Sequence, residues 1–330
     1  MKALVLTEFG GPENFQLQDI PRPEVKPGYV LVRQAATSIN AIDIKIRGGL
    51  PIGPAMPAVL GADVAGRVEA VGAGVLDFAP GDAVYGCAGG VRGQGGSLAE
   101  YMLADARLLA PKPEKLSFRE AAALPLVTIT AWEAWERSQL SSGQHVLVHG
   151  GIGGVGHIAI QLARAMGARV ATTIAGDAAS NIAMSLGADE TIDFQKESVA
   201  AYVERLTGGQ GFDVVFDTIG GGNLPNSFEA AQTHGQVVTT NARTTQDLSV
   251  LHAKALSFHA VFMLLPLLTG VGRDRHGRIL RSAARLVDEG KLRPLIDAHS
   301  FTLATAADAH RLLESGKAQG KIVIDIDPSL

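Results

Sequence analysis

The stretch that decides the fold of this chain is HVLVHGGIGGVG, residues 145–156. A run rich in β-branched residues passes into a glycine-rich turn, and an apolar helical pattern follows over residues 158–166. Gly151, Gly153 and Gly156 have the spacing of a dinucleotide fingerprint, in the strand-to-helix context that it requires. Glycines let the backbone approach a pyrophosphate, and the N-terminus of the following helix attracts that anion. We therefore predict dinucleotide binding by Gly151, Gly153, Gly154, Val155 and Gly156.

Around this stretch the sequence alternates between strand and helix patterns. This alternation is typical of a parallel sheet with helices on both faces, so the predicted fold class is α/β. The predicted strands cover 145–149, 169–174, 213–217 and 236–240, and the predicted helices cover 158–166 and 178–186.

The two ends of the chain lack this alternation. From Gly48 to Gly96, glycines and prolines recur between short valine-rich stretches, which predicts a mostly β first third. Ser117 and Glu120 have the spacing of a capping box and predict the start of a helical region. The C-terminal portion predicts helix at 278–286, helix at 306–313 and strand at 321–326.

Length and composition limit the classes of protein to consider. A chain of 330 residues favours two domains, and 46% hydrophobic with 19% charged residues describes a globular chain rather than a disordered one. A net charge of −4 gives no global attraction to nucleic acid or to an anionic membrane, so we expect small-molecule partners. The most apolar window, 255–268, is too short to span a bilayer and predicts a buried strand that leads into a helix.

Cys87 is the single cysteine, which excludes an internal disulfide and every zinc site that needs two or more thiolates. We expect Cys87 to be a small hydrophobic residue, either buried or in a loop, rather than a nucleophile. The first residues lack the pattern of a secretory signal, so a reducing cytoplasm is the expected compartment.

The predicted second strand ends in Ile174-Ala175-Gly176, with no acidic residue to bind a ribose 2′-hydroxyl. The small residues Ala175 and Gly176 leave room for a 2′-phosphate and favour NADPH. Asp177 disfavours a dianion, however, and no Arg or Lys lies between Arg169 and Lys196. NADH therefore remains the alternative cofactor.

Several stretches together resemble the medium-chain dehydrogenase/reductase superfamily and, within it, the zinc-free quinone oxidoreductase (zeta-crystallin-like) branch. They are SINAID at 38–43 with RGG at 47–49, VLGADVAG at 59–66, GGSLAEY at 95–101, AAALP at 121–125 and the loop at 150–156. The resemblance implies a GroES-like β domain at 1–122 and 267–330, a Rossmann domain with a doubly wound parallel sheet at 123–266, and an active site in the cleft between them. It also implies a homodimer or tetramer, in which the apolar segment 258–265 forms an edge strand that pairs with a second subunit.

Zinc-dependent alcohol dehydrogenases of this superfamily hold a catalytic metal with a cysteine, a His-Glu pair and a second cysteine. The matching positions here resemble Asn40, Ala62-Asp63 and Leu126. Because a catalytic zinc needs three protein ligands and only Asp63 could serve, we expect no metal and disfavour zinc-dependent alcohol oxidation.

The resemblance instead implies hydride transfer from NADPH to a quinone or to the β-carbon of an enone. Asn40 resembles a cleft asparagine that orients the substrate oxygen, with turn capping as the alternative, and Thr130 resembles a threonine beside the nicotinamide. Gly220, Asn241 and Lys321 fall where family members line the nicotinamide and pyrophosphate. The chain departs from the family where Phe194 replaces a tyrosine that helps to hold the 2′-phosphate, and where Ser180 or Asn181 replaces a lysine. We expect Asp43 and Arg47 to make internal contacts only.

Two alternatives stay open. An enoyl-thioester or haloacrylate-type reductase would use the same hydride chemistry. An NADPH- or RNA-binding protein with little catalysis would belong to a different class. RNA binding requires a basic surface, whereas the only candidate patch, 273–278, contains Asp274 and is expected to be a solvated turn.

Overall fold

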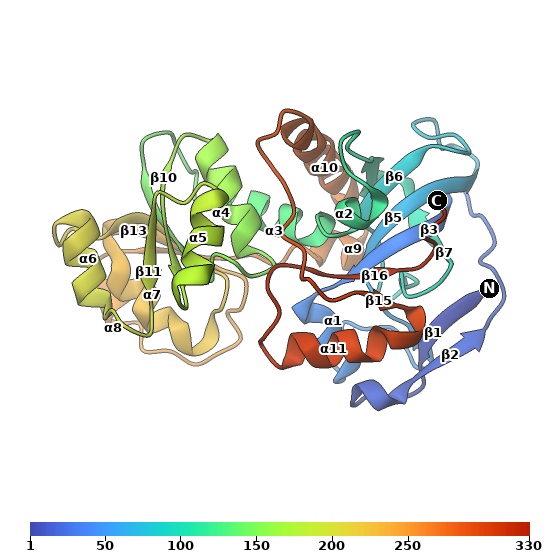
Figure 1. Cartoon of the computed structure of the whole chain (residues 1–330), viewed down its shortest axis with the longest axis horizontal. Helices are drawn as coiled ribbons and strands as arrows, with labels where there is room; N and C mark the ends of the chain where they lie inside the picture. The colour runs from blue at the N-terminus through green and yellow to red at the C-terminus, as the bar shows by residue number, and fades with distance from the viewer. The chain divides into compact units, whose positions relative to one another are not determined.

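The computed structural model describes residues 1–330, and the chain divides into two compact units. Unit 1 comprises Met1–Ile129 and Leu264–Leu330, and unit 2 comprises Thr130–Met263. The division falls a few residues from the boundaries predicted at 122/123 and 266/267. The first division, between Ile129 and Thr130, lies inside the helix α3 (Pro125–Arg137). A sequence pattern gives no signal for a domain boundary within a continuous helix. Figure 1 colours both units by residue number.

Unit 1 is built on two sheets, and both ends of the chain contribute to it. The smaller sheet has the order β2-β1-β4 and the larger β15-β16-β3-β5-β6-β8, with β7 also paired to β3. The strands are β1 (Lys2–Leu6), β2 (Phe15–Asp19), β3 (Tyr29–Ile39), β4 (Ala58–Val59), β5 (Asp63–Val71), β6 (Ala83–Cys87), β7 (Tyr101–Asp105), β8 (Leu109–Pro111), β15 (Phe301–Thr302) and β16 (Ile322–Asp325). The helices, besides the first part of α3, are α1 (Ala41–Arg47), α2 (Phe118–Ala122), α9 (Leu265–Thr269), α10 (Arg273–Asp288) and α11 (Ala306–Glu314).

The C-terminal strand β16 returns to the N-terminal part of the chain. It pairs antiparallel with β3, so that Ile322 lies opposite Ile39. This pairing brings Lys321, the residue before β16, to the end of β3, where Asn40 follows.

Unit 2 is a six-stranded parallel sheet of order β11-β10-β9-β12-β13-β14. The strands are β9 (His145–His149), β10 (Arg169–Ile174), β11 (Glu190–Asp193), β12 (Phe212–Asp217), β13 (Ala231–Thr239) and β14 (Ser257–Ala260), and the helices are α4 (Gly156–Ala165), α5 (Asp177–Ser185), α6 (Val199–Thr207), α7 (Leu224–Ala230) and α8 (Ser249–Ala253). The predicted alternation and the doubly wound α/β class are confirmed.

Helices cover both faces of this sheet. Leu147, Val215 and Val237 share a buried cluster with Tyr202 of α6 and Phe228 of α7. Figure 1 shows α4 and α5 on the other side of the strands from α6. Strand order reverses at β9, whose neighbours β10 and β12 lie on opposite sides of it, so the carboxyl end of β9 is the switch point where open α/β sheets bind ligands.

Three expectations need correction. The strand predicted at 258–265 ends at Ala260, and a helix begins at Leu265, because Pro266 suits the first turn of a helix. That strand is not buried, since Phe258 at this sheet edge is 38% exposed. The patch at 273–278 is the start of α10 rather than a solvated turn, and Arg273 is buried against Asp105 at 2.8 Å.

Several smaller expectations are confirmed. Ser117 and Glu120 form the capping box of α2, and Cys87 is buried. Asp43 and Arg47 make internal contacts, to the Asn40 main chain and to Glu314. None of the helices combines the length and the apolar character that crossing a membrane requires.

Candidate functional site

The glycine loop lies between the end of β9 at His149 and the start of α4 at Gly156. A Cβ atom on Gly151 would lie 2.1 Å from Thr172 Oγ1, and one on Gly156 would lie 2.0 Å from the Gly150 carbonyl oxygen. The chain's own packing therefore requires these two glycines. Gly153 differs, because its Cβ would meet only the Gly150 oxygen, at 3.2 Å. A small shift relieves such a contact, so the packing does not fully explain why residue 153 lacks a side chain.

His149 supplies a second polar feature at the switch point. Its Nδ1 lies 3.3 Å from Thr173 Oγ1, which also accepts the Gly150 N–H at 3.0 Å. Burial lowers the pKa of His149, so the ring is neutral, and its buried Nε2 has no hydrogen-bond partner. The Nδ1 contact ties His149, at the end of β9, to the neighbouring strand β10. Two features therefore fit a polar ligand, such as a dinucleotide, at this edge of the sheet. They are the His149 Nε2 atom without a hydrogen-bond partner and the absence of a side chain at residue 153.

Gly220 and Asn241 come together at the carboxyl ends of β12 and β13. A Cβ on Gly220 would lie 2.3 Å from the Asn241 carbonyl oxygen, and the Asn241 amide donates to the Ile219 oxygen at 3.3 Å. Asp217 fixes this turn by accepting the Gly220 N–H at 2.8 Å. Sequence reasoning missed Asp217, although its position at the end of a predicted strand was a usable signal.

Ala175, Gly176 and Phe194 lie at the same edge, beyond β10 and β11. The Phe194 N–H donates to the Ile174 oxygen at 3.2 Å, and the Phe194 side chain is 58% exposed. All predicted cofactor residues of unit 2 therefore follow the carboxyl ends of adjacent parallel strands. Their roles toward a cofactor remain predictions.

Unit 1 contains a buried polar cluster around Asp63. One carboxylate oxygen, Oδ2, accepts from Ser38 Oγ at 2.7 Å and from Asn40 Nδ2 at 2.8 Å. The other, Oδ1, accepts the Leu126 N–H at 2.8 Å. Lys321 Nζ lies 3.6 Å from Asp63 Oδ2 and donates to the Ile39 oxygen and to Asn40 Oδ1.

This cluster determines what Asn40 can do. Asn40 occupies the N-cap position of α1, yet Asp63 and Lys321 hold its side chain. One Nδ2 hydrogen is used, and no acceptor in the protein takes the other. The Lys321 side chain is 2% exposed and its ammonium is bonded within unit 1. The cofactor contact expected of Lys321 stays a prediction.

Burial also shifts the ionisation of neighbouring groups. It raises the pKa of Asp43 to about 7, against the hydrogen bond from the Asn40 N–H. It raises the pKa of the Cys87 thiol well above its usual range, so Cys87 is a poor nucleophile. It lowers the pKa of Lys321, an effect that Asp63 and Asp43 oppose.

The structure does not bring a metal-ligand set together. No group of three or more His, Cys, Asp or Glu side chains could hold a metal ion. Asp63, the single candidate ligand among the positions compared with zinc enzymes, already accepts hydrogen bonds from Ser38, Asn40 and Leu126. Thr130, the second predicted catalytic residue, is 5% exposed on α3 and belongs to unit 2, whereas Asn40 belongs to unit 1.

Comparison with known families matches two parts of the chain. Residues 26–114 match the alcohol dehydrogenase GroES-like domain, and residues 186–324 match a family described as zinc-binding dehydrogenase.

Curated relatives match along almost the whole chain. A 2-methylene-furan-3-one reductase of Solanum lycopersicum is 34% identical, over 98% of this chain and 79% of the relative. An NADPH-dependent alkenal/one oxidoreductase of Arabidopsis thaliana, described as chloroplastic, is 33% identical with the same coverage. A quinone oxidoreductase of Rattus norvegicus is 30% identical, over 98% of this chain and 97% of the relative.

Solved structures are similar as well. An alcohol dehydrogenase superfamily protein from Novosphingobium aromaticivorans has a TM-score of 0.93 at 43% identity, and covers 98% of this chain and 99% of that one. A mycobacterial protein in complex with NADPH has a TM-score of 0.87 at 28% identity, with the same coverage.

Proposed function

Since the chain belongs to the medium-chain dehydrogenase/reductase superfamily, in its quinone oxidoreductase branch, we propose that it is an NADPH-dependent reductase of quinones or enones that works without zinc. It is an NAD(P)H-dependent oxidoreductase. The observation that carries the finer proposal is the buried cluster of Asp63, Asn40 and Lys321. In this cluster Asn40 donates to Asp63, and Lys321 donates to Asn40 and lies 3.6 Å from Asp63.

Unit 2 binds the cofactor in this proposal. The turn from Gly154 to Gly156, which leads into α4, offers backbone N–H groups to the pyrophosphate, whereas the N–H groups of Gly150, Gly151 and Gly153 donate within the chain. Gly220 and Asn241 line the next part of the dinucleotide, and His149 Nε2 is available for a polar contact. When bound, the nicotinamide supplies the hydride. The names of the Arabidopsis relative and of the mycobacterial complex support NADPH as the cofactor.

Unit 1 supplies Asn40. Its second Nδ2 hydrogen has no internal acceptor, so it can donate to the substrate oxygen on which negative charge develops. Asp63 and Lys321 hold the two ends of the amide in one orientation, which makes them positioning residues. A quinone or enone is already electrophilic and gains from one such donor, whereas oxidation of an unactivated alcohol needs stronger stabilisation of an alkoxide.

Zinc does not fit the residues at these positions. A catalytic zinc site requires three protein ligands, and Asn40, Asp63 and Leu126 supply a single carboxylate that is already hydrogen-bonded. The chain therefore resembles the zinc-binding dehydrogenase family in sequence and fold without carrying that donor set.

A screen of cofactor oxidation tests the proposal. NADPH and NADH are each offered with quinones, enones, enals, enoyl thioesters and simple ketones, with and without a chelator, and the purified protein is analysed for metal. We expect NADPH turnover with quinones or enones that the chelator leaves unchanged. One zinc per chain together with loss of turnover on chelation would overturn the metal-free proposal, and turnover confined to enoyl thioesters would overturn the substrate class.

A further inference from the structure

An ion pair lies next to the tip of β10, at the edge of unit 2 where the adenosine ribose is expected. Asp193, the last residue of β11, places Oδ2 2.9 Å from Lys196 Nζ. The same oxygen accepts the Gly176 N–H at 3.4 Å, and Asp193 lies opposite Ile174 in the sheet register. The pair is therefore in contact with a residue predicted to accommodate a 2′-phosphate.

Lys196 supplies a cation beside this position. No Lys or Arg occurs between Arg169 and Lys196 in the chain. Asp193 and then Asp177 raise the pKa of Lys196, which places Asp177 within electrostatic range as well. The Lys196 side chain is 68% exposed, so its ammonium can change partners, whereas Asp193 is 14% exposed and is held by the Gly176 and Gln195 N–H groups.

The two cofactors make opposite demands on such a pair. A ribose 2′-hydroxyl donates to a carboxylate, whereas a 2′-phosphate dianion needs a cation and is repelled by a carboxylate. We infer that the Asp193–Lys196 pair sets the cofactor preference, with Lys196 moving to bind the 2′-phosphate of NADPH and Asp193 opposing it. This inference rests on the proposed function, and it assigns a specificity role to two residues outside the dinucleotide fingerprint.

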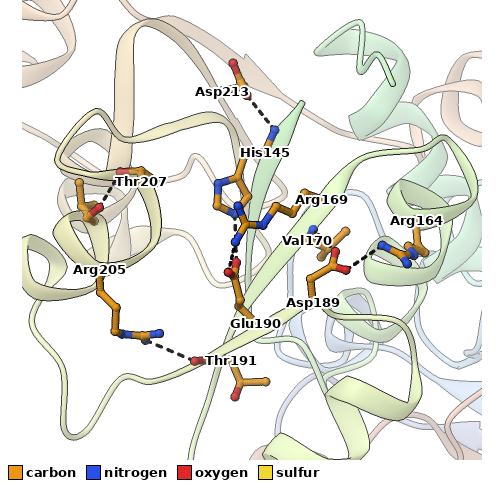
Figure 2. Close-up of polar contacts among 11 residues, drawn as sticks. His145, Arg164, Arg169, Val170, Asp189, Glu190, Thr191, Arg205, Thr207 and Asp213 are labelled. Atoms are coloured by element: carbon orange, nitrogen blue, oxygen red, sulfur yellow. Dashed lines mark hydrogen bonds and ion pairs between the residues drawn. The ribbon is translucent and has the colours of Figure 1, made fainter. Parts of the chain in front are cut away.

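The same strand provides a matched control at its other end. Asp189, just before β11, places Oδ1 2.7 Å from Arg164 Nη1 and accepts the Val170 N–H through Oδ2 at 2.8 Å (Figure 2). Arg164 lies in the last turn of α4 and is 57% exposed. This pair has similar geometry and exposure, but it lies at the amino end of the strand, opposite the edge that carries the glycine loop.

Binding titrations of the full chain test the inference without turnover. Wild type, Lys196→Gln, Asp193→Asn and Arg164→Gln are titrated with NADPH and NADH, and with adenosine 2′,5′-bisphosphate and 5′-AMP as probes that carry no hydride. We expect Lys196→Gln to weaken NADPH and the bisphosphate by about fivefold, as for loss of one exposed charge contact, with NADH nearly unchanged. Asp193→Asn should tighten NADPH, and Arg164→Gln should change neither cofactor.

The outcomes separate this inference from the function on which it rests. If wild type binds NADPH or NADH and Lys196→Gln leaves their ratio unchanged, the inference is wrong and the proposed function stands. If wild type binds neither cofactor, both fail. Because Asp193→Asn could disturb the turn that it supports, thermal melting of each variant is measured, and the Lys196→Gln result decides if Asp193→Asn does not fold.

Discussion

Asp63 Oδ2 lies 2.8 Å from Asn40 Nδ2 and takes one of its two amide hydrogens. Asp63 is the first residue of β5 and Asn40 directly follows β3, so two neighbouring strands fix the amide before any substrate is present. Lys321 holds the carbonyl end of the same amide. A donor fixed in advance costs no reorganisation as charge develops, which is the requirement for stabilising a transition state.

Replacing Asn40 with alanine is expected to lower kcat by about tenfold, less than for a dry oxyanion site because water can replace the amide. Asn40→Asp should lower kcat further, since a carboxylate there would repel the developing charge and Asp63. NADPH affinity should change little in both variants. Steady-state kinetics and cofactor titration measure this prediction, and equal kcat values for the three proteins would reduce Asn40 to a turn residue.

Breaking the buried pair should cost far more stability than removing it altogether. Lys321→Met or Asp63→Asn each leaves one buried charged group without its counter-charge, and we expect a loss of about 3 to 5 kcal/mol in the free energy of unfolding. The double variant should recover part of that loss. Denaturant unfolding of the single and double variants measures the coupling, and strictly additive losses would contradict it.

Gly153 and Gly156 should respond differently to one added methyl group. Gly153→Ala meets only the Gly150 oxygen, so the fold should survive while cofactor affinity falls by about tenfold or more, because the backbone can no longer approach the pyrophosphate. Gly156→Ala would place a Cβ 2.0 Å from that oxygen and should lower the melting temperature as well. Unchanged cofactor affinity in folded Gly153→Ala would remove the loop from the binding site.

His310 should make the protein sensitive to acid. Burial and the nearby Arg47 lower its pKa to about 3, so the folded ring stays neutral where the unfolded ring takes a proton. The stability that the neutral His310 ring contributes is therefore lost as pH falls below about 6.5. The resulting decrease in the free energy of unfolding is about 2 kcal/mol at pH 5. Asp43, with a pKa raised to about 7, acts in the opposite direction. The test is therefore the difference in the free energy of unfolding between His310→Leu and wild type. The variant should gain stability relative to wild type as the pH falls from 7 to 5.

The edge strand β14 should pair with a second copy of the chain. Phe258 and Phe262 are 38% and 45% exposed beside an unpaired strand edge, a combination that otherwise favours aggregation. We expect a dimer or a larger even assembly by light scattering at micromolar concentration. Phe262→Glu should weaken it, and Leu76→Glu, at a residue 94% exposed in unit 1, should not. A monomeric wild type would contradict the prediction.

Sequence alone determined the features that local chemistry dictates. The glycine spacing at 151, 153 and 156, the alternation of strand and helix patterns and the capping box at Ser117 each follow from short-range sterics and hydrogen bonding. They gave the α/β class, the parallel sheet and the edge at which a dinucleotide is expected. The length of β14 was harder to predict, because an apolar run looks the same in a strand and in the helix start that follows it.

Tertiary structure decided which distant groups meet. Asn40, Asp63, Leu126 and Lys321 come from four separate segments, and only the antiparallel return of β16 onto β3 places an ammonium against the Asn40 amide. Likewise, only the register of β11 beside β10 places the Asp193–Lys196 pair next to the end of β10. Side-chain periodicity reports the face on which a residue lies but not the partner it meets. Contacts between residues far apart in sequence depend on how the strands pair and how the side chains between them pack.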